Sequence, residues 1–440
     1  MDGATPEFNR DAPQVPERTI LLLIAAVHFI NILDFMIVMP LGPEFARHLG
    51  IPAHALGLIA GSYTAAAALS GIAGSFFLDR FDRRKALAVS MAGLILGTAA
   101  GGLAQDLPSL IVTRVVAGIF GGPATSISLA IIGDIVPPQR RGRALSRVFA
   151  AFSVASIAGV PVSLEIANAA GWRAPFFAVA ALGAVVVAIA MKVMPPLRLH
   201  LQRGDKPPGL RAMLRTFTRP LPLLAYCGTA AMMTSAFAVI PSIPPYLEFN
   251  LGYTGEPWLA DALSSLGTSY RPSVLGPLYF IGGLVSLVVL SAVGRLTDRL
   301  GSSLMSWLGA ALVIAVAWIG FIDYRPWLPV LALFVGWMGS MSMRGVPART
   351  LDTKIPAPHE RAGFMSAQSA VQHLSLAAVT GLSSLVLHEN PDHSLVGLPI
   401  MGAVSVGFAL VLPACVTLAE AALRRRDGGE VRLSSPGASP

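Results

Sequence analysis

Long apolar stretches alternate with short polar ones along nearly the whole chain. The stretches at residues 20–42, 86–104, 174–194, 274–293 and 398–419 are clear examples. Each is long enough to cross a bilayer as a helix, which takes about 17–25 apolar residues. The pattern predicts an all-α membrane protein with twelve transmembrane helices, at residues 20–43, 55–79, 86–105, 107–136, 144–168, 174–194, 220–248, 273–294, 303–323, 327–349, 363–388 and 396–422.

Composition and charge agree with a membrane protein. Hydrophobic residues make up 54% of the chain and charged residues 13%, whereas roughly a quarter of a soluble protein is charged. The net charge of +8 does not indicate nucleic acid, because the basic residues lie in short clusters between the apolar stretches. This is the positive-inside pattern, and it predicts a multi-pass protein of the cytoplasmic (inner) membrane with both termini cytoplasmic. On this assignment Arg344 and Arg349 belong to the cytoplasmic side, and the outer segments hold only Arg47, Arg173, Arg271 and Arg325.

The chain is expected to contain two six-helix halves, at residues 20–195 and 220–424. A basic stretch at 196–219, broken by Pro207 and Pro208, is the expected cytoplasmic linker between them. Residues 1–19 form a cytoplasmic N-terminal segment, and the tail at 425–440 is expected to be disordered.

An internal repeat supports the two halves. The pair Asp79–Arg80 after the second helix recurs as Asp298–Arg299 after the eighth. Pro138, Arg141 and Ser146 after the fourth helix recur at nearly the same offset as Pro358, Arg361 and Ser366. Transporters built from such parallel repeats hold their substrate between the repeats, near the middle of the membrane.

The repeated loops resemble the cytoplasmic loop signature of the major facilitator superfamily: Gly, three residues, Asp, Arg or Lys, any residue, Gly, Arg, and Arg or Lys. In the first half Ser75 and Asp82 stand where the family has glycines. Arg114, followed four residues later by Gly118, resembles the family's fourth-helix pattern. Residues 159–176 resemble the fifth and sixth helices of exporters in the family. The resemblance covers nearly the whole chain and implies the bacterial twelve-helix drug or metabolite:proton antiporter branch. The residues that match the loop signature, Asp79, Arg80, Arg83 and Arg84 with Gly294, Asp298, Arg299 and Gly301, are then the expected cytoplasmic gate.

The acidic residue Asp34 and the basic residue Arg114 fall well inside predicted spans. Counted from the helix ends, both lie about 9 Å from the outer boundary of the hydrocarbon core. They meet if the first and fourth helices adjoin, as the family's fold implies. A carboxylate in hydrocarbon costs about 2.5–3.5 kcal/mol, so Asp34 is either half of a structural ion pair or a proton or substrate site.

Further residues are expected near Asp34, in a site that couples protons or substrate to transport, and in the cytoplasmic gate. His28 and Asn31 precede Asp34 at spacings of three, which predicts a polar stripe facing a cavity. Glu165 is a second candidate carboxylate for coupling, and Asp134 is expected to join Asp79 and Arg83 in the gate. The alternative for the loop residues is that they only set topology. Proline is expected to bend or break helix five at Gly159 and Pro161, and helix seven at Pro241, Pro244 and Pro245.

Motifs for other functions are missing from the sequence. It has no phosphate-binding loop, no His-Glu-x-x-His and no nucleophile elbow, so neither ATP hydrolysis nor an enzyme activity is expected, and no cofactor or metal. We expect a monomeric secondary transporter that exports a small drug-like molecule or metabolite by alternating access, in exchange for protons. The expected partners are the lipid bilayer, the substrate and protons, without nucleic acid. The alternatives are a sugar or metabolite exporter or uniporter without proton coupling, and a receptor on the same fold. The expected cavity residues are Tyr63, Tyr226, Met232, Met233, Trp337, Gln368 and Gln372.

Overall fold

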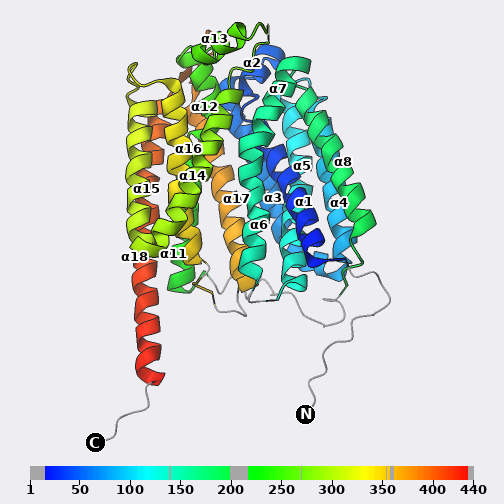
Figure 1. Ribbon diagram of the computed structural model, residues 1–440, viewed down its shortest axis with the longest axis vertical. Coiled ribbons are helices and arrows are strands. Elements are labelled where there is room, and N and C mark those ends of the chain that lie inside the picture. Colours follow the sequence, from blue (N-terminus) through cyan, green and yellow to red (C-terminus); the bar gives the residue numbers. More distant parts are fainter. Residues whose placement is uncertain are drawn as a thin grey trace, which may run out of the picture.

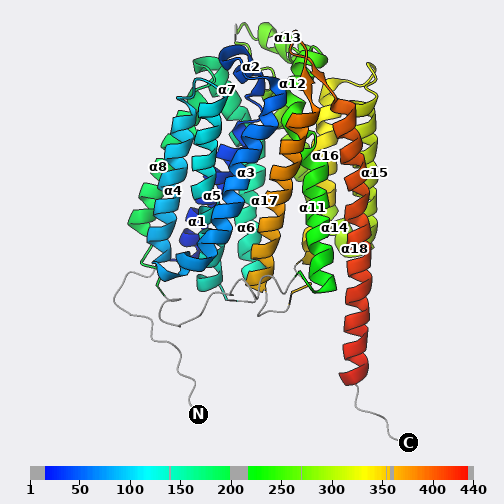
Figure 2. The same ribbon diagram turned by 180° about the vertical axis from the view of Figure 1, so that it is seen from behind.

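Long helices run side by side between two ends of the molecule (Figures 1 and 2). The computed structural model describes residues 15–137, 140–198, 217–268, 270–352, 354–356 and 361–434. Within these ranges ten helices are long and apolar enough to cross a membrane. The helices α4 (Arg83–Gly101) and α16 (Val330–Asp352) run beside them and complete the twelve-helix arrangement. We call the end where the first helix begins and the last helix ends the lower end, as it lies in Figure 1.

The first half contains six of the long segments, and its fifth segment is two helices joined by a π-helical turn. A short helix and two 3₁₀ turns lie in the connections. In chain order its elements are α1 (Glu17–Ile37), α2 (Gly42–Leu49), η1 (Ala53–Ala55), α3 (Leu56–Phe77), η2 (Leu78–Arg80), α4, α5 (Leu107–Ile135), α6 (Arg141–Val154), η3 (Ala155–Gly159), α7 (Val160–Ala170) and α8 (Ala174–Val193).

The second half contains the other six long segments and one short antiparallel hairpin, in which His388 pairs with Val396 and Glu389 with Leu395. In chain order its elements are α11 (Pro220–Phe237), η4 (Ile240–Ser242), α12 (Ile243–Pro245), η5 (Tyr246–Asn250), α13 (Pro257–Ser265), α14 (Gly276–Leu300), α15 (Ser302–Ala317), η6 (Trp318–Ile322), α16, α17 (Arg361–Val386), β1 (His388–Glu389), β2 (Leu395–Val396) and α18 (Leu398–Ser434).

Both predicted helix irregularities are present. The fifth segment passes through the π-helical turn η3 directly before Pro161, where the missing proline N–H interrupts the regular hydrogen-bond ladder. Gly159 allows close packing beside this turn, because a Cβ there would lie 2.7 Å from Cδ1 of Leu33 on α1 and the leucine side chain would have to shift. The seventh segment ends its regular helix at Phe237. It continues through the 3₁₀ turn η4, which contains Pro241, the short α-helical turn α12, which contains Pro244 and Pro245, and the π turn η5.

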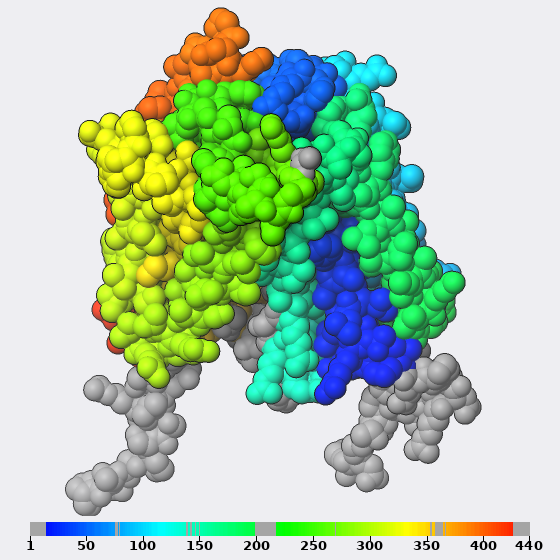
Figure 3. Space-filling view, turned by 45° about the horizontal axis from the view of Figure 1, so that its top comes forward, coloured from blue at the N-terminus to red at the C-terminus, as the bar shows by residue number. Residues whose placement is uncertain are grey.

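The two halves lie on opposite sides of the molecule. In Figure 1 the helices up to α8 lie on the right and most of the later ones on the left, while α17 lies near the centre and packs against α3. A second contact joins α14 to η3 and α7. In Figure 3 the halves meet over the upper face, and the surface is notched between the lower parts of α14 and α6.

The C-terminal end differs from its prediction. The tail was expected to be disordered from residue 425, but α18 continues to Ser434. An ion pair one helical turn apart, between Glu420 and Arg424 at 2.8 Å, supports the helix where it leaves the bundle. Most of the predicted linker (199–216), residues 1–14, Pro138, Pro358 and residues 435–440 lie outside the described residues.

Candidate transport site

Asp34 and Arg114 meet inside the first half, as their equal depth predicts. Nη1 of Arg114 on α5 donates a hydrogen bond to Oδ1 of Asp34 on α1, and the two atoms are 2.9 Å apart. The side chains are 0% and 1% exposed. A charge buried in this way is costly unless a partner compensates it, and each of these residues supplies the partner of the other.

Side chains on two neighbouring helices contact the Asp34–Arg114 pair. Thr98 on α4 donates to the same Oδ1 of Asp34 at 2.6 Å, and the guanidinium carbon of Arg114 lies 5.4 Å from the ring centre of Phe176 on α8, as a cation–π contact. Oδ2 of Asp34 is buried and has no hydrogen-bond partner among the described residues. One oxygen of the carboxylate is therefore held by two donors, and the other is held by none among the described residues.

The polar residues of the predicted stripe on α1 lie in two different environments. Nδ2 of Asn31 donates to the carbonyl of Gly121 at 2.9 Å, and its Oδ1 accepts from the hydroxyl of Tyr63 at 2.9 Å. His28 is buried at a different place, close enough to Arg349 of α16 for their charges to interact. Asn31 and Asp34 thus turn into the first half, because interhelical hydrogen bonds satisfy them there, and His28 faces the second half.

Glu165 lies apart from Asp34, at the upper end of the molecule. Its carboxylate accepts hydrogen bonds from the Ser273 backbone N–H at 3.0 Å, from the Ser273 hydroxyl at 2.6 Å and from the Tyr270 hydroxyl. The bond to Glu165, with partial burial and the charge of the carboxylate, raises the pKa of Tyr270 to about 12. Glu165 therefore ties α7 of the first half to the residues before α14 of the second.

Further polar contacts join the halves at this end. Arg47 on α2 forms an ion pair with Glu248 on η5 at 2.5 Å, and the backbone N–H of Ala53 donates to the Glu389 side chain. We call the contacts of Glu165, Glu248 and Glu389 with the opposite half the upper seam. Nothing in the sequence marks Glu248 and Glu389, because acidic residues at the ends of predicted helices look like ordinary solvated positions.

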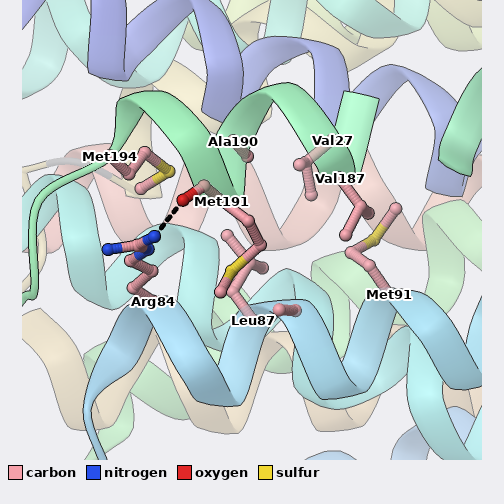
Figure 4. A pocket seen from close by; sticks show the side chains of 9 residues that line it. Val27, Arg84, Leu87, Met91, Val187, Ala190, Met191 and Met194 are labelled. Atoms are coloured by element: carbon pink, nitrogen blue, oxygen red, sulfur yellow. Dashed lines mark hydrogen bonds between the residues drawn. The ribbon is translucent and has the colours of Figure 1, made fainter. Parts of the chain in front are cut away.

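At the lower end, the predicted gate of the first half is partly described. Nε of Arg83 lies 2.8 Å from Oδ2 of Asp134, which confirms that these two residues pair. Arg80 is exposed, and the side chain of Asp79 lies outside the description. Arg84 donates to the Met191 carbonyl beside a methionine-lined crevice (Figure 4). The crevice measures about 10 Å³, barely the space of one water molecule, so it is not a substrate site.

Asp82 replaces a signature glycine, and the structure gives it a role that the sequence did not reveal. Its side chain caps α4 by accepting from the Arg84 N–H at 3.0 Å, and it accepts from the Leu197 N–H at 3.1 Å and from Nε of Arg198 at 3.0 Å. Burial alone would raise the pKa of Asp82, but these hydrogen bonds and the Arg198 charge hold it below its usual value. Asp82 therefore ties the chain after α8 to the start of α4.

The gate residues of the second half form a separate cluster. Gly301 joins α14 to α15 with a φ of 88°, a conformation that favours glycine. Asp298 is exposed and lines a hollow of about 270 Å³ with Lys354 and Glu420. Arg299 is also exposed, and the space beside Gly294 is open.

Three predicted cavity residues are core residues instead. Tyr63 is 4% exposed, and its hydroxyl donates to Asn31. Tyr226 is 2% exposed and stacks on Phe364 with ring centres 5.2 Å apart. Trp337 is 2% exposed and meets Phe321 edge to face at 5.1 Å. Aromatic residues at helical spacing serve packing as readily as binding, and packing is their role here.

The remaining predicted cavity residues are neither fully buried nor fully exposed. Met232, Met233 and Gln372 are half-buried. Gln368 on α17 donates to Thr229 at 3.0 Å and to Asp352. Asp352 is a half-buried acid at the end of α16 that no sequence motif marks.

Arg344 lies in the interior of the bundle, and not in a polar segment at the cytoplasmic surface as the sequence assignment had it. It lies within α16 and is 0% exposed. A basic residue near the end of a predicted span looks like a positive-inside residue, and only its packing partners reveal that it belongs to the interior.

Comparison with known proteins places this geometry in a family. The model of the Major Facilitator Superfamily matches residues 24–380. The chain belongs to this superfamily. Its members are membrane transporters and not enzymes, and this protein is therefore a multi-pass membrane transporter that takes small molecules.

Curated relatives and solved structures of the superfamily agree. The chain is 27% identical over 364 residues to a chloramphenicol resistance protein of Streptomyces lividans, covering 82% of this chain and 86% of the relative. It is 24% identical over 379 residues to the inner membrane transport protein YdhP of Escherichia coli K12, covering 85% and 90%. A bacterial homologue of the human lysosomal transporter Spinster, in an inward-facing conformation, superimposes with a TM-score of 0.65 at 15% identity over 94% of this chain and 99% of that one. A D-xylose–proton symporter gives a TM-score of 0.65 at 17% identity over 90% and 97%. At these identities the structural matches concern the fold alone.

Proposed function

We propose that this superfamily member is a secondary active transporter that exports a small organic molecule from the cytoplasm in exchange for protons. The buried Asp34–Arg114 pair is the observation that carries the proposal. Similarity to a chloramphenicol resistance protein makes chloramphenicol the first compound to test.

Proton coupling rests on the two oxygens of Asp34. Oδ1 is held by Arg114 and Thr98, whereas Oδ2 has no described partner. A proton on Oδ2 removes the carboxylate charge, and the hydrogen bond to Arg114 then loses about half of its strength. A change of one pKa unit corresponds to about 1.4 kcal/mol, and the membrane potential contributes about 2.3 kcal/mol per charge per 100 mV. A small displacement of α1 relative to α5 can therefore couple proton binding to conformational change.

The lower end is the cytoplasmic end in this proposal, in keeping with the positive-inside pattern. The upper seam then closes the outer side, and the protein is inward-facing. Opening toward the outside requires the contacts of Glu165, Glu248 and Glu389 with the opposite half to break. The Arg83–Asp134 pair and the loop of Asp298 are the proposed cytoplasmic gate, which closes as the upper seam opens.

The test uses proteoliposomes with an acidic lumen and labelled chloramphenicol outside. The wild type should accumulate chloramphenicol against its concentration gradient. Asp34→Asn should lose this accumulation but still let chloramphenicol equilibrate, because the variant keeps the shape of the side chain and cannot exchange a proton. Asp106→Asn is the matched control: Asp106 caps α5 in the connection before that helix, and asparagine caps equally well.

Each outcome selects one function. Accumulation by Asp34→Asn at the wild-type rate would remove proton coupling through Asp34 and favour the structural role of the pair. Equilibration without accumulation by the wild type would indicate a uniporter. Binding of chloramphenicol without any movement would indicate a receptor.

A further inference from the structure

Arg344 is a second buried cation, in the half that carries no proposed coupling carboxylate. It lies 14 residues into α16, about 21 Å along the helix from its upper end, and its side chain is 0% exposed. Nη1 donates to the Ser235 hydroxyl at 2.8 Å, and Nη2 contacts the Met232 carbonyl at 3.3 Å and Sδ of Met341 at 3.0 Å. All of these partners are neutral.

The hydrogen-bond capacity of the guanidinium is not used up. Nε of Arg344 is buried without a partner, and no carboxylate forms an ion pair with Arg344 among the residues that the structure describes. The Ser235 hydroxyl gives its own proton to the Ser405 carbonyl at 2.8 Å and so presents a lone pair to Arg344. Neutral acceptors offset only part of the cost of burying a cation, and an anion offsets much more.

Arg344 lies near the boundary between the two halves. Arg344 bridges α16 and α11, and both helices face α1 of the first half. Phe237 at the end of α11 lies 6.1 Å from the ring of Phe35, and Arg349 of α16 interacts with His28. Met232 and Met341 beside the guanidinium are half-buried, and methionine side chains adapt readily to a ligand.

We propose that Arg344 binds the anionic group of the transported molecule, so that the substrates include organic anions with an apolar body. Nε and one Nη of an arginine match the two oxygens of a carboxylate. The methionines offer a soft apolar surface to the body of the ligand. The inference deepens the proposed function, on which it rests, by naming a substrate class.

Salicylate and its neutral amide, salicylamide, are the probes, because they share an apolar ring and differ in the carboxylate. Binding of each to the purified full-length protein is measured by calorimetry for the wild type, Arg344→Gln, Arg344→Lys and Ser235→Ala. The wild type should prefer salicylate by about tenfold or more, which corresponds to about 1.4 kcal/mol. Arg344→Gln should bring the preference close to one, whereas Arg344→Lys and Ser235→Ala, which keep the cation, should retain most of it.

Several results would overturn the inference. It is wrong if the wild type binds both probes equally or binds neither, and this measurement does not depend on how well the variants fold. An unchanged preference in Arg344→Gln would show that Arg344 only ties α11 to α16. The chloramphenicol assay separates the two proposals: salicylate selectivity without proton-driven transport leaves the anion site standing, and the reverse result leaves the antiporter standing.

Discussion

Among the residues that the structure describes, each half buries one arginine in the interior of a helix, and the two halves compensate its charge differently. Arg114 in the first half pairs with Asp34. Arg344 in the second half contacts a hydroxyl, a carbonyl and a thioether, with no described carboxylate. The offset of the loop repeat places Phe334 opposite Arg114, and Phe334 packs on Tyr279 with ring centres 4.8 Å apart. The repeat has therefore kept the helices and not the charges, so the two halves are fitted to different tasks.

The largest expected effect comes from breaking the compensated pair. Arg114→Met leaves the Asp34 carboxylate buried without its cation, and the free energy of unfolding should fall by about 3–5 kcal/mol. The double variant Asp34→Leu/Arg114→Met removes both charges and should recover most of this loss. Thermal melting of the purified protein, followed by tryptophan fluorescence, measures both changes. A double variant as unstable as Arg114→Met alone would show that charge compensation is not what the pair provides.

The next effect tests the donor that supports the pair. Thr98→Val keeps the shape of the side chain but removes its hydrogen bond to Asp34, and hydrogen bonds to charged groups contribute about 1.5–3 kcal/mol. The matched change in the other half, Ser235→Ala, removes one acceptor of Arg344 and should cost less, since Arg344 keeps its other contacts. The melting temperatures of the two variants show which of them loses more stability. A larger loss for Ser235→Ala would reverse the comparison.

The sequence predicts the parts of this picture that depend on length, depth and local chemistry. Twelve spans follow from apolar runs of the required length. The contact between Asp34 and Arg114 follows from their equal depth along the first and fourth helices. The turn at Gly159 and Pro161 follows from proline's missing N–H. Each of these predictions needs only one segment, or two segments and a family arrangement.

The rest depends on which faces pack together. Thr98 gave no signal, because a helical threonine usually bonds to the carbonyl one turn back, as Thr98 also does to Leu94 at 2.8 Å. Arg344 was misplaced because its partner Ser235 lies on another helix, far away in the sequence. Tyr226 and Trp337 were expected in a cavity, since residue type alone does not distinguish a core aromatic from a binding one.

A third prediction makes the second half resemble the first. Ser235→Asp places a carboxylate within reach of Nη1 of Arg344, as Asp34 is within reach of Arg114. An internal counter-ion should displace the external one, so the affinity for salicylate should fall by about tenfold or more while salicylamide binding stays the same. Calorimetry with the two probes measures the change, with Ser235→Asn as the uncharged control. Undiminished salicylate binding in Ser235→Asp would mean that the anion does not bind at Arg344.

The smallest effect on stability is expected from Arg344→Met. This change removes a cation that no described carboxylate compensates, and exchanging buried charge for an apolar side chain of similar length is often neutral or stabilising. The loss of the hydrogen bond to Ser235 works against this gain, so the free energy of unfolding should stay within about 1 kcal/mol of the wild type. Melting curves beside those of Arg114→Met provide the measurement, because both variants make the same substitution at an equally buried site. If both lose stability equally, the charge of Arg344 is compensated in the protein as fully as that of Arg114, and the asymmetry between the halves disappears. If only Arg114→Met loses stability, the cation in the second half is there for a ligand and not for the fold.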